Sequence, residues 1–371
     1  MVEQLLPPIE ELATPHGDAV PAGVKSAAPP PGGGAALLQI DNLVVDFATD
    51  DGVVRAVDGV SLVVNPGEIV GLVGESGCGK SVTAMSILGL IRPPGRVTDG
   101  SILFRGRDLR GMPAAELRTI RGGQIAMIFQ DPMTTLNPVM TVGAQIVEAL
   151  RLHQKISRAR ARSRAVELLT MLGVPDPQMC YGQYPHQFSG GMRQRAMVAM
   201  AIANDPELLI ADEPTTALDV TIQAQVLEVL RTAQRGTGAA TILITHDLGV
   251  VAELADRLVV MYAGRVVEQA DVHTIFREPR HPYTLGLLTS IPRIDVEDDE
   301  LWPISGSPPD LLAPPTGCTF HPRCPLARDV CRTERPLLEQ VAEGHRTACH
   351  FHQELIGADG RDLFSASQAR T

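Results

Sequence analysis

The chain contains the stretch Gly74-Glu75-Ser76-Gly77-Cys78-Gly79-Lys80-Ser81, which has the GxxxxGKS spacing of a phosphate-binding loop. The apolar run 69–73 precedes this loop, and an expected helix beginning at Val82 follows it. Glycines in such a loop let backbone N–H groups surround a phosphate, and the helix N-terminus adds positive potential. The lysine reaches the β- and γ-phosphates, and the last hydroxyl binds Mg²⁺. The stretch therefore predicts a nucleotide site that extends to Val82, with Lys80 and Ser81 in these two roles.

The composition excludes several classes of protein. A chain of 371 residues, 44% of them hydrophobic, can form one large domain and a smaller one. The net charge of -11 argues against a nucleic-acid partner, because phosphate neutralisation needs clustered Lys and Arg. No apolar run approaches the roughly 18 residues that span a bilayer, and the N-terminus lacks a signal pattern. We therefore expect a soluble, cytoplasmic protein.

Local composition divides the chain into three parts. Residues 1–36 are rich in Pro, Gly and Ala without periodic apolar spacing, which predicts a disordered tail. Residues 37–290 alternate strand-like and helix-like runs, which is typical of an α/β domain with parallel strands. Helical spacing dominates at about 131–200 and predicts an α-helical subdomain. Residues 291–371 are rich in Pro and Cys, so we expect a small C-terminal extension.

A second motif carries acidic residues. The run Leu208-Leu209-Ile210-Ala211-Asp212-Glu213 is an apolar strand that ends in two carboxylates. In nucleotide hydrolases such a strand places one acid to hold Mg²⁺ and the next to orient or deprotonate the attacking water. We predict these roles for Asp212 and Glu213, respectively.

Between the two motifs lies the run Phe188-Ser189-Gly190-Gly191-Met192, immediately before an apolar helix. With this run the sequence resembles the ABC transporter ATPase family, whose signature is usually LSGGQ, so that Phe188 and Met192 depart from the commonest form. A serine hydroxyl, glycine N–H groups and a helix N-terminus form a second phosphate cradle. The resemblance implies that Ser189, Gly190 and Gly191 close over ATP bound to a partner subunit. It also implies a P-loop ATPase core with a mixed sheet, an antiparallel β subdomain and an α-helical subdomain.

Other positions match the same family one by one. The resemblance implies that Gln130 joins the core to the helical subdomain, that Asp219 contacts the partner in a dimer, and that His246 contacts the γ-phosphate. The candidate catalytic residues are therefore Glu213, His246 and Gln130, and the candidate magnesium ligands are Ser81, Gln130 and Asp212.

The residue that stacks on adenine is a separate question. Phe47 is the candidate, and Arg55 is the alternative because a guanidinium also stacks on an aromatic ring. Ordinary packing explains Phe47 equally well, since most Phe side chains are buried in a core.

Further stretches resemble the dipeptide and oligopeptide permease branch of the family. They are residues 130–138, His281-Pro282-Tyr283-Thr284 and residues 317–325. The resemblance implies an ATP-hydrolysing motor subunit of a peptide importer, peripheral on the cytoplasmic face of the cell membrane. It also implies a homologous ATPase subunit as partner, two transmembrane permease subunits and an extracytoplasmic substrate-binding protein. The alternatives are the same motor role for nickel or another small solute, and a soluble ABC ATPase outside transport.

Four cysteines in the extension have the spacing C-x5-C-x6-C-x17-C: Cys318, Cys324, Cys331 and Cys349. In a reducing compartment, grouped cysteines favour metal ligation over disulfides. Four thiolates suit an iron-sulfur cluster or Zn²⁺, and this spacing matches neither the close pairs of zinc sites nor the ferredoxin run. Members of the resembled branch carry a [4Fe-4S] cluster on a matching set. The resemblance therefore implies this cluster, with Zn²⁺ as the alternative.

Overall fold

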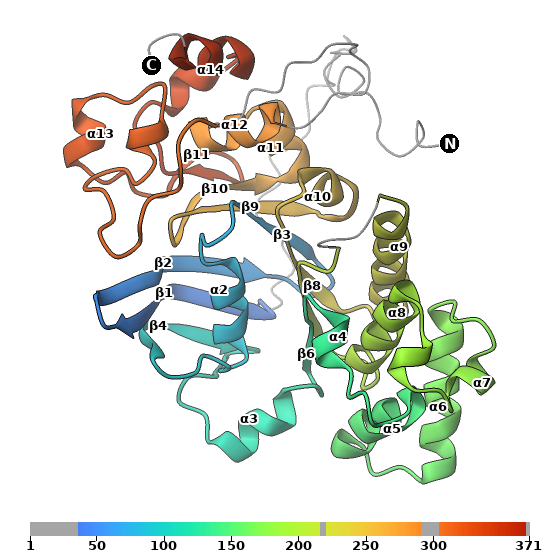
Figure 1. Ribbon diagram of the computed structural model, residues 1–371. Helices are drawn as coiled ribbons and strands as arrows, with labels where there is room; N and C mark the ends of the chain where they lie inside the picture. Colours follow the sequence, from blue (N-terminus) through green and yellow to red (C-terminus); the bar gives the residue numbers. More distant parts are fainter. Residues whose placement is uncertain (1–35, 216–219, 291–303, 369–371) are drawn as a thin grey trace, which may run out of the picture.

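The computed structural model describes residues 36–215, 220–290 and 304–368, so the expected N-terminal tail lies almost wholly outside it. Two sheets organise the described chain (Figure 1). The smaller sheet contains, in spatial order, β2 (Gly52–Val64), β1 (Leu38–Thr49), β4 (Gly95–Phe104) and β5 (Arg107–Asp108). The larger sheet contains, in spatial order, β11 (Glu339–Ala342), β12 (His345–Thr347), β10 (Arg265–Asp271), β9 (Arg257–Tyr262), β3 (Ile69–Val73), β8 (Ala240–Thr245), β7 (Leu208–Asp212) and β6 (Ile125–Ile128).

The smaller sheet is the antiparallel subdomain that the family resemblance implies. Strand β1 pairs in antiparallel fashion with both β2 and β4. The sequence pattern suggests two separate strands at 53–57 and 60–64, but they form the single strand β2. The register shifts on both sides of the Leu43↔Val60 pair, next to Gly59. Such bulges let a strand bend without ending, and apolar periodicity alone cannot reveal them.

Strands β9, β3, β8, β7 and β6 of the larger sheet are parallel. Strands β7 and β8 are buried along their whole length, as expected for apolar runs covered on both faces. Because parallel strands end at the same edge, the loops after β3, β7 and β8 meet there. This edge brings together the phosphate loop, Glu213 and His246, which are far apart in the sequence.

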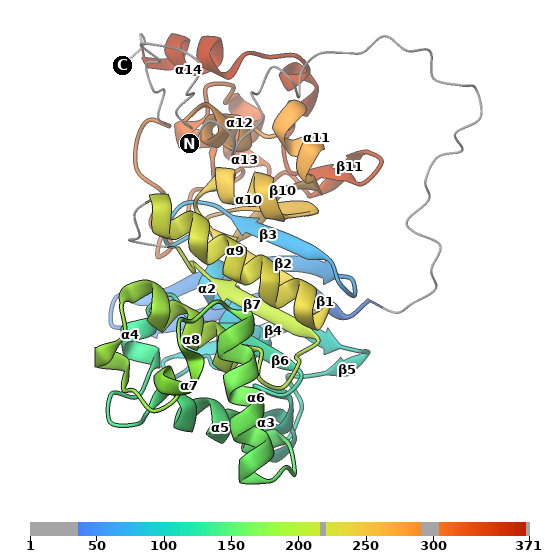
Figure 2. The ribbon, with the colours of Figure 1, turned by 90° about the vertical axis from the view of Figure 1, so that its right-hand side faces the viewer.

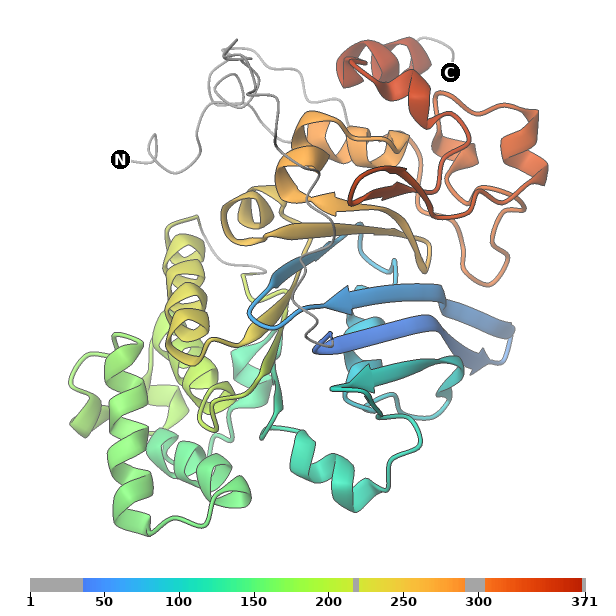
Figure 3. The same cartoon turned by 180° about the vertical axis from the view of Figure 1, so that it is seen from behind.

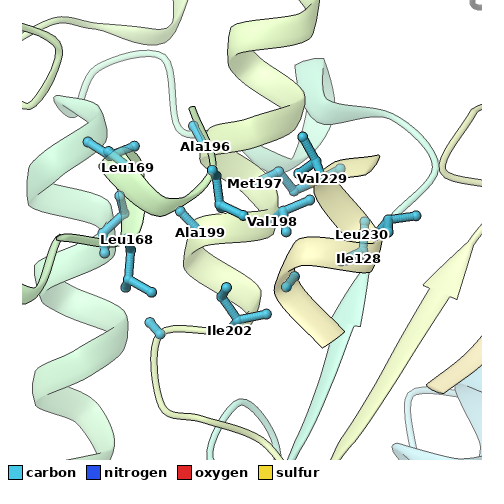
Figure 4. Packing of buried hydrophobic residues seen from close by; sticks show 14 of the residues in the cluster. Ile128, Leu168, Leu169, Ala196, Met197, Val198, Ala199, Ile202, Val229 and Leu230 are labelled. Atoms are coloured by element: carbon cyan, nitrogen blue, oxygen red, sulfur yellow. The ribbon is translucent and has the colours of Figure 1, made fainter. Parts of the chain in front are cut away.

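Helices occupy most of the chain from residue 132 to 201, the region where the spacing predicts a helical subdomain (Figure 2). Figure 4 shows how they pack: Leu168 and Leu169 face Ala199 and Ile202, and Ile128 of β6 lies on their far side, near Leu230 of α9. All six side chains are buried in one cluster, so the helical layer and the sheet share one apolar core. The helices of this layer are α4 (Pro132–Thr135), α5 (Val142–His153), α6 (Arg158–Met171), α7 (Pro177–Cys180), η1 (Pro185–Gln187), α8 (Gly190–Ala201) and α9 (Val220–Thr237).

The other helices surround the two sheets. Within the described ranges, no helix is both long and apolar enough to cross a membrane. The helices outside the helical layer are α2 (Lys80–Ile87), α3 (Ala114–Ile120), α10 (Leu248–Leu254), α11 (Val272–Arg277), α12 (Pro282–Thr289), η2 (His321–Arg323), α13 (Asp329–Thr333), η3 (His352–Leu355) and α14 (Gly360–Gln368).

The C-terminal extension adds strands to the larger sheet (Figure 3). Strand β12 pairs in antiparallel fashion with β10, and β11 pairs with β12. Phe320 of the extension packs against Tyr262 and Tyr283, with ring centroids 5.2 and 5.4 Å away. A fully buried carboxylate, Glu268, accepts hydrogen bonds from the backbone N–H groups of Arg280 and His281, and it lies 2.7 Å from Nε2 of His345. The extension therefore shares a core with the sheet that carries the phosphate loop.

We expect Phe320→Ala to destabilise the extension, because Phe320 is 1% exposed and closes this aromatic cluster. Removing a buried Phe side chain costs about 3–5 kcal/mol. Limited proteolysis should cut the variant within the extension faster than the parent chain. Leu337→Ala is the matched control, since Leu337 lies in the same extension and is 69% exposed. Equal protection of the Phe320 variant and the parent chain would contradict the shared core.

Candidate functional site

The phosphate loop has a backbone that only glycine can adopt at two of its positions. Gly74 has a φ of 150° and Gly79 a φ of 101°, and both values lie in a region that L side chains rarely occupy. A Cβ at Gly74 would lie 2.2 Å from the carbonyl oxygen of Met261, and one at Gly79 would lie 2.4 Å from that of Ala56. The motif glycines are thus required by close approach to β9 and β2 as well as by the turn.

Lys80 is the first residue of α2 and is 4% exposed. Its ammonium group donates hydrogen bonds to the carbonyl oxygens of Gly74, at 2.8 Å, and Glu75, at 3.0 Å. Both acceptors are uncharged, so these bonds fix the lysine under the loop without neutralising it. A fixed cation at a helix N-terminus can bind the oxygens of a phosphate.

Ser81 and Asp212, two of the candidate magnesium ligands, are in direct contact. The Ser81 hydroxyl donates a 2.8 Å hydrogen bond to Asp212 Oδ1. Burial raises the pKa of Asp212, although the Ser81 hydrogen bond opposes this shift. A hydroxyl and a carboxylate are the hard oxygen ligands that Mg²⁺ prefers. Loop and strand therefore provide a donor pair that suits this ion.

The three candidate catalytic residues meet at the ends of β6, β7 and β8. Gln130 Nε2 donates a 3.2 Å hydrogen bond to Glu213 Oε2, and His246 Nδ1 lies 3.8 Å from the same oxygen. Glu213 has a φ of 46°, the left-handed conformation that non-glycine residues rarely adopt. Such strained residues cluster at active sites because the surrounding structure holds them there. Oε2 of Glu213 therefore lies close to both Gln130 and His246 at this strained position.

The signature residues lie in a different place from the phosphate loop. Ser189 caps α8, and its hydroxyl accepts a hydrogen bond from the Met192 N–H at 3.4 Å. A Cβ at Gly190 or Gly191 would have no atom within 4 Å, so this face of the loop is open. Phe188 is 3% exposed, which explains how an aromatic residue replaces the usual leucine as a core anchor. In Figures 1 and 3, strands β6 to β8 lie between α2 and α8.

Three other expectations have different outcomes. Phe47 is partly buried and packs against the core, its ring lying over Gly95, and this geometry favours the packing interpretation. The guanidinium of Arg55 is paired with Asp46 at 2.9 Å. Asp219 lies outside the described residues.

The four extension cysteines come together in the fold. All six cysteines of the chain are unpaired thiols. Cys318, Cys324, Cys331 and Cys349 line one pocket, next to His321. Burial, and to a smaller extent the neighbouring thiols, raises the pKa of Cys324 and Cys349. Among the described residues, no three His, Cys, Asp or Glu side chains are placed to hold a single metal ion. The expected grouping is present, and the expected metal site is not shown.

Two residues that contact the loop, Tyr283 and Arg323, lie in stretches that the sequence analysis singled out without giving them a role at the nucleotide site. The Tyr283 hydroxyl accepts a 2.8 Å hydrogen bond from the backbone N–H of Glu75, and Arg323 forms an ion pair with the Glu75 carboxylate. Burial raises the pKa of Tyr283, so the hydroxyl stays neutral. Both residues lie more than 200 positions from the loop, and no fixed spacing links them to it. Sequence reasoning therefore had no signal for these contacts.

Comparison with known proteins agrees with this geometry. A family model described as "ABC transporter" matches residues 57–216, and one described as "Oligopeptide/dipeptide transporter, C-terminal region" matches residues 267–331. The chain is 52% identical to the dipeptide transport ATP-binding protein DppD of Bacillus subtilis, over 88% of this chain and 99% of that protein. It is 50% identical to the oligopeptide transport ATP-binding protein OppD of Salmonella typhimurium, over 84% and 93%.

Solved structures give the same fold. A dimeric ATP-binding cassette in a post-hydrolysis state, bound to ADP and Pi, is 26% identical to this chain with a TM-score of 0.57. The match covers 63% of this chain and 98% of that one. A cassette core thus accounts for about two thirds of the chain, and the remainder lies outside this comparison.

We expect Lys80→Ala to weaken binding of Mg-ATP by at least about tenfold, because a charge-assisted contact to phosphate is lost. Isothermal titration with a non-hydrolysable ATP analogue measures this change. Lys155→Ala is the control, since Lys155 is exposed and far from the loop in sequence. Unaltered affinity in the Lys80 variant would contradict the assignment of the loop.

Proposed function

The chain belongs to the family of ABC transporter ATP-binding subunits, and on that premise we propose that it is the motor subunit of an importer for dipeptides and oligopeptides. The observation that carries the proposal is the meeting of Lys80, Ser81, Asp212 and Glu213 at one edge of the parallel sheet. The match of residues 267–331 to the peptide-transporter C-terminal region favours peptides as the cargo.

Hydrolysis at this edge needs positioning and charge neutralisation rather than covalent chemistry. Lys80 and the loop N–H groups bind the phosphates, while Ser81 and Asp212 would hold Mg²⁺. Mg²⁺ would neutralise charge on the phosphate oxygens when bound. Glu213 accepts the proton of the attacking water, and Gln130, which hydrogen-bonds to Glu213, orients that water. His246, beside Glu213, contacts the γ-phosphate.

A second ATPase subunit completes each site in the proposal. Ser189, Gly190 and Gly191 form an open cradle on the far side of the sheet from the phosphate loop of the same chain. This arrangement suits a head-to-tail pair in which each cradle covers the ATP of the other subunit, with Asp219 at the contact. ATP binding favours the closed pair and hydrolysis releases it, and this difference in affinity can move two membrane permease subunits. An extracytoplasmic binding protein would deliver the peptide, and the ATPase pair would lie on the cytoplasmic face of the membrane.

Glu213→Gln should abolish nearly all turnover, by about a hundredfold or more, while ATP still binds, because only the proton acceptor is removed. Phosphate release measures turnover, and size-exclusion chromatography with ATP should detect a trapped dimer. Glu228→Gln is the control, since Glu228 lies on the exposed face of α9. Turnover at the parent rate in the Glu213 variant would refute its role as the base.

We also propose that Cys318, Cys324, Cys331 and Cys349 hold a [4Fe-4S] cluster. The support is that four unpaired thiols line one pocket, in a segment that matches the peptide-transporter C-terminal region up to Cys331. A tetrahedral zinc site brings its sulfurs to about 2.3 Å from one point, whereas a cluster binds them at separate corners. When bound, the cluster would link η2, α13 and the segment after β12. We favour a structural role, because metal ligation supplies folding free energy to short segments.

Anaerobically purified chain should contain about four iron and four acid-labile sulfide per chain. Cys324→Ser should lose most of both and become more sensitive to protease in the extension, with a smaller effect on ATP turnover. Cys180→Ser is the control, because Cys180 is buried in the helical layer and lies outside the pocket. One zinc without sulfide would replace the cluster with the alternative metal and leave the ATPase proposal unaffected.

A further inference from the structure

The phosphate loop has a set of partners in the C-terminal extension. Arg323 Nη1 donates to Glu75 Oε2 at 2.6 Å, and Nη2 donates to Oε1 at 2.9 Å. Two parallel N–H···O bonds of this kind form the strongest type of ion pair in proteins, with fixed geometry. Glu75 is the second residue of the phosphate loop, so the extension holds the loop directly.

Arg323 is itself held rigidly. Its side chain is 6% exposed. Nε donates to the carbonyl oxygen of Ser305 at 3.0 Å, Nη2 to that of Ile304 at 3.3 Å, and Nη1 to the Tyr262 hydroxyl at 3.4 Å. All three guanidinium nitrogens therefore have acceptors. A planar, buried guanidinium with this many partners holds the loop in place. An exposed ion pair would contribute little to stability.

Glu75 links this support to the lysine of the site. Its backbone N–H donates to the Tyr283 hydroxyl at 2.8 Å, and its carbonyl oxygen accepts from Lys80 at 3.0 Å. A shift of Glu75 would therefore displace an acceptor that places the Lys80 ammonium. The ion pair, the tyrosine contact and the lysine contact all converge on one residue of the loop.

Because Glu75 is negatively charged, its ion pair with Arg323 affects the binding of an anionic ligand. The Glu75 side chain is 26% exposed, so solvent screens its carboxylate only in part. A carboxylate in a phosphate-binding loop opposes the binding of a triphosphate. Arg323 neutralises this charge, and without it the loop would lose an anchor and carry an uncompensated negative charge.

We propose that Arg323 is a positioning residue for the ATP site, which acts through Glu75 to hold the phosphate loop in its triphosphate-binding conformation. The C-terminal extension thereby sets nucleotide affinity as well as covering the sheet. This inference rests on the proposed function, because it takes ATP as the ligand of the loop.

The test compares two arginine variants of the full-length chain. Arg323→Ala should weaken binding of a non-hydrolysable ATP analogue by about tenfold, and it should raise the KM for ATP more than it lowers kcat. Arg328→Ala is the matched control: Arg328 lies in the same extension and pairs with Glu354, but its side chain is 54% exposed. The control should bind with parent affinity. Equal losses in both variants, with equal falls in Tm by circular dichroism, would overturn the proposal, because they would indicate a general weakening of the extension.

A double-mutant cycle tests whether Arg323 acts through Glu75. In a Glu75→Gln background, removing Arg323 leaves no uncompensated carboxylate in the loop, so Arg323→Ala should cost much less affinity than it does in the parent chain. Additive losses would overturn the role of Glu75. Arg323→Lys should recover only part of the affinity, since an ammonium group cannot make the two parallel bonds.

The Lys80→Ala variant separates this inference from the proposed function. If Lys80→Ala loses nucleotide and Arg323→Ala does not, the positioning role fails while the ATP site stands. If neither variant changes binding of the analogue, the phosphate loop is not the nucleotide site and the proposed function fails with it.

Discussion

Backbone hydrogen bonds between β3, β8 and β7 hold these parallel strands in a register that brings their carboxyl ends to one edge. The positions of the candidate magnesium ligands and catalytic residues depend on that register. It places the Ser81 hydroxyl against the Asp212 carboxylate, and it places Glu213 beside His246. Because both faces of β7 and β8 are buried, a slip in pairing would disrupt close side-chain packing on both faces, so the apolar core protects the geometry of the site.

The C-terminal extension shares its sheet and its apolar core with the ATPase domain, so the two form one folded unit. Strand β12 continues the larger sheet, and Phe320 packs against both Tyr262 and Tyr283. Both tyrosines also contact the groups around the phosphate loop through their hydroxyls, Tyr283 with Glu75 and Tyr262 with Arg323. Apolar packing and polar contacts thus come from the same rings, which connects the stability of the extension to the shape of the loop.

In the proposed function, a second subunit completes the nucleotide site. Helix α2, which begins at the phosphate loop, and helix α8, which Ser189 caps, lie on opposite sides of β6 to β8, and the candidate catalytic residues lie at the ends of these strands. A helix N-terminus with two open glycines is suited to anions from outside. In the proposed function, this division of the site between two surfaces would let hydrolysis change the association of subunits.

The sequence by itself determined the phosphate loop, the acidic strand end and the helical region, because these depend on local spacing: glycines at fixed offsets, an apolar run before two acids, and a 3.6-residue period. It also predicted that Gln130, Glu213 and His246 act together, and they lie in contact, although only the resemblance to a family suggested it. Only the tertiary structure decided that β2 is one strand and that Phe47 packs over Gly95. It alone joined Arg323 to Glu75 across 248 residues, because long-range contacts depend on how the sheet and extension pack and leave no periodic trace in the chain.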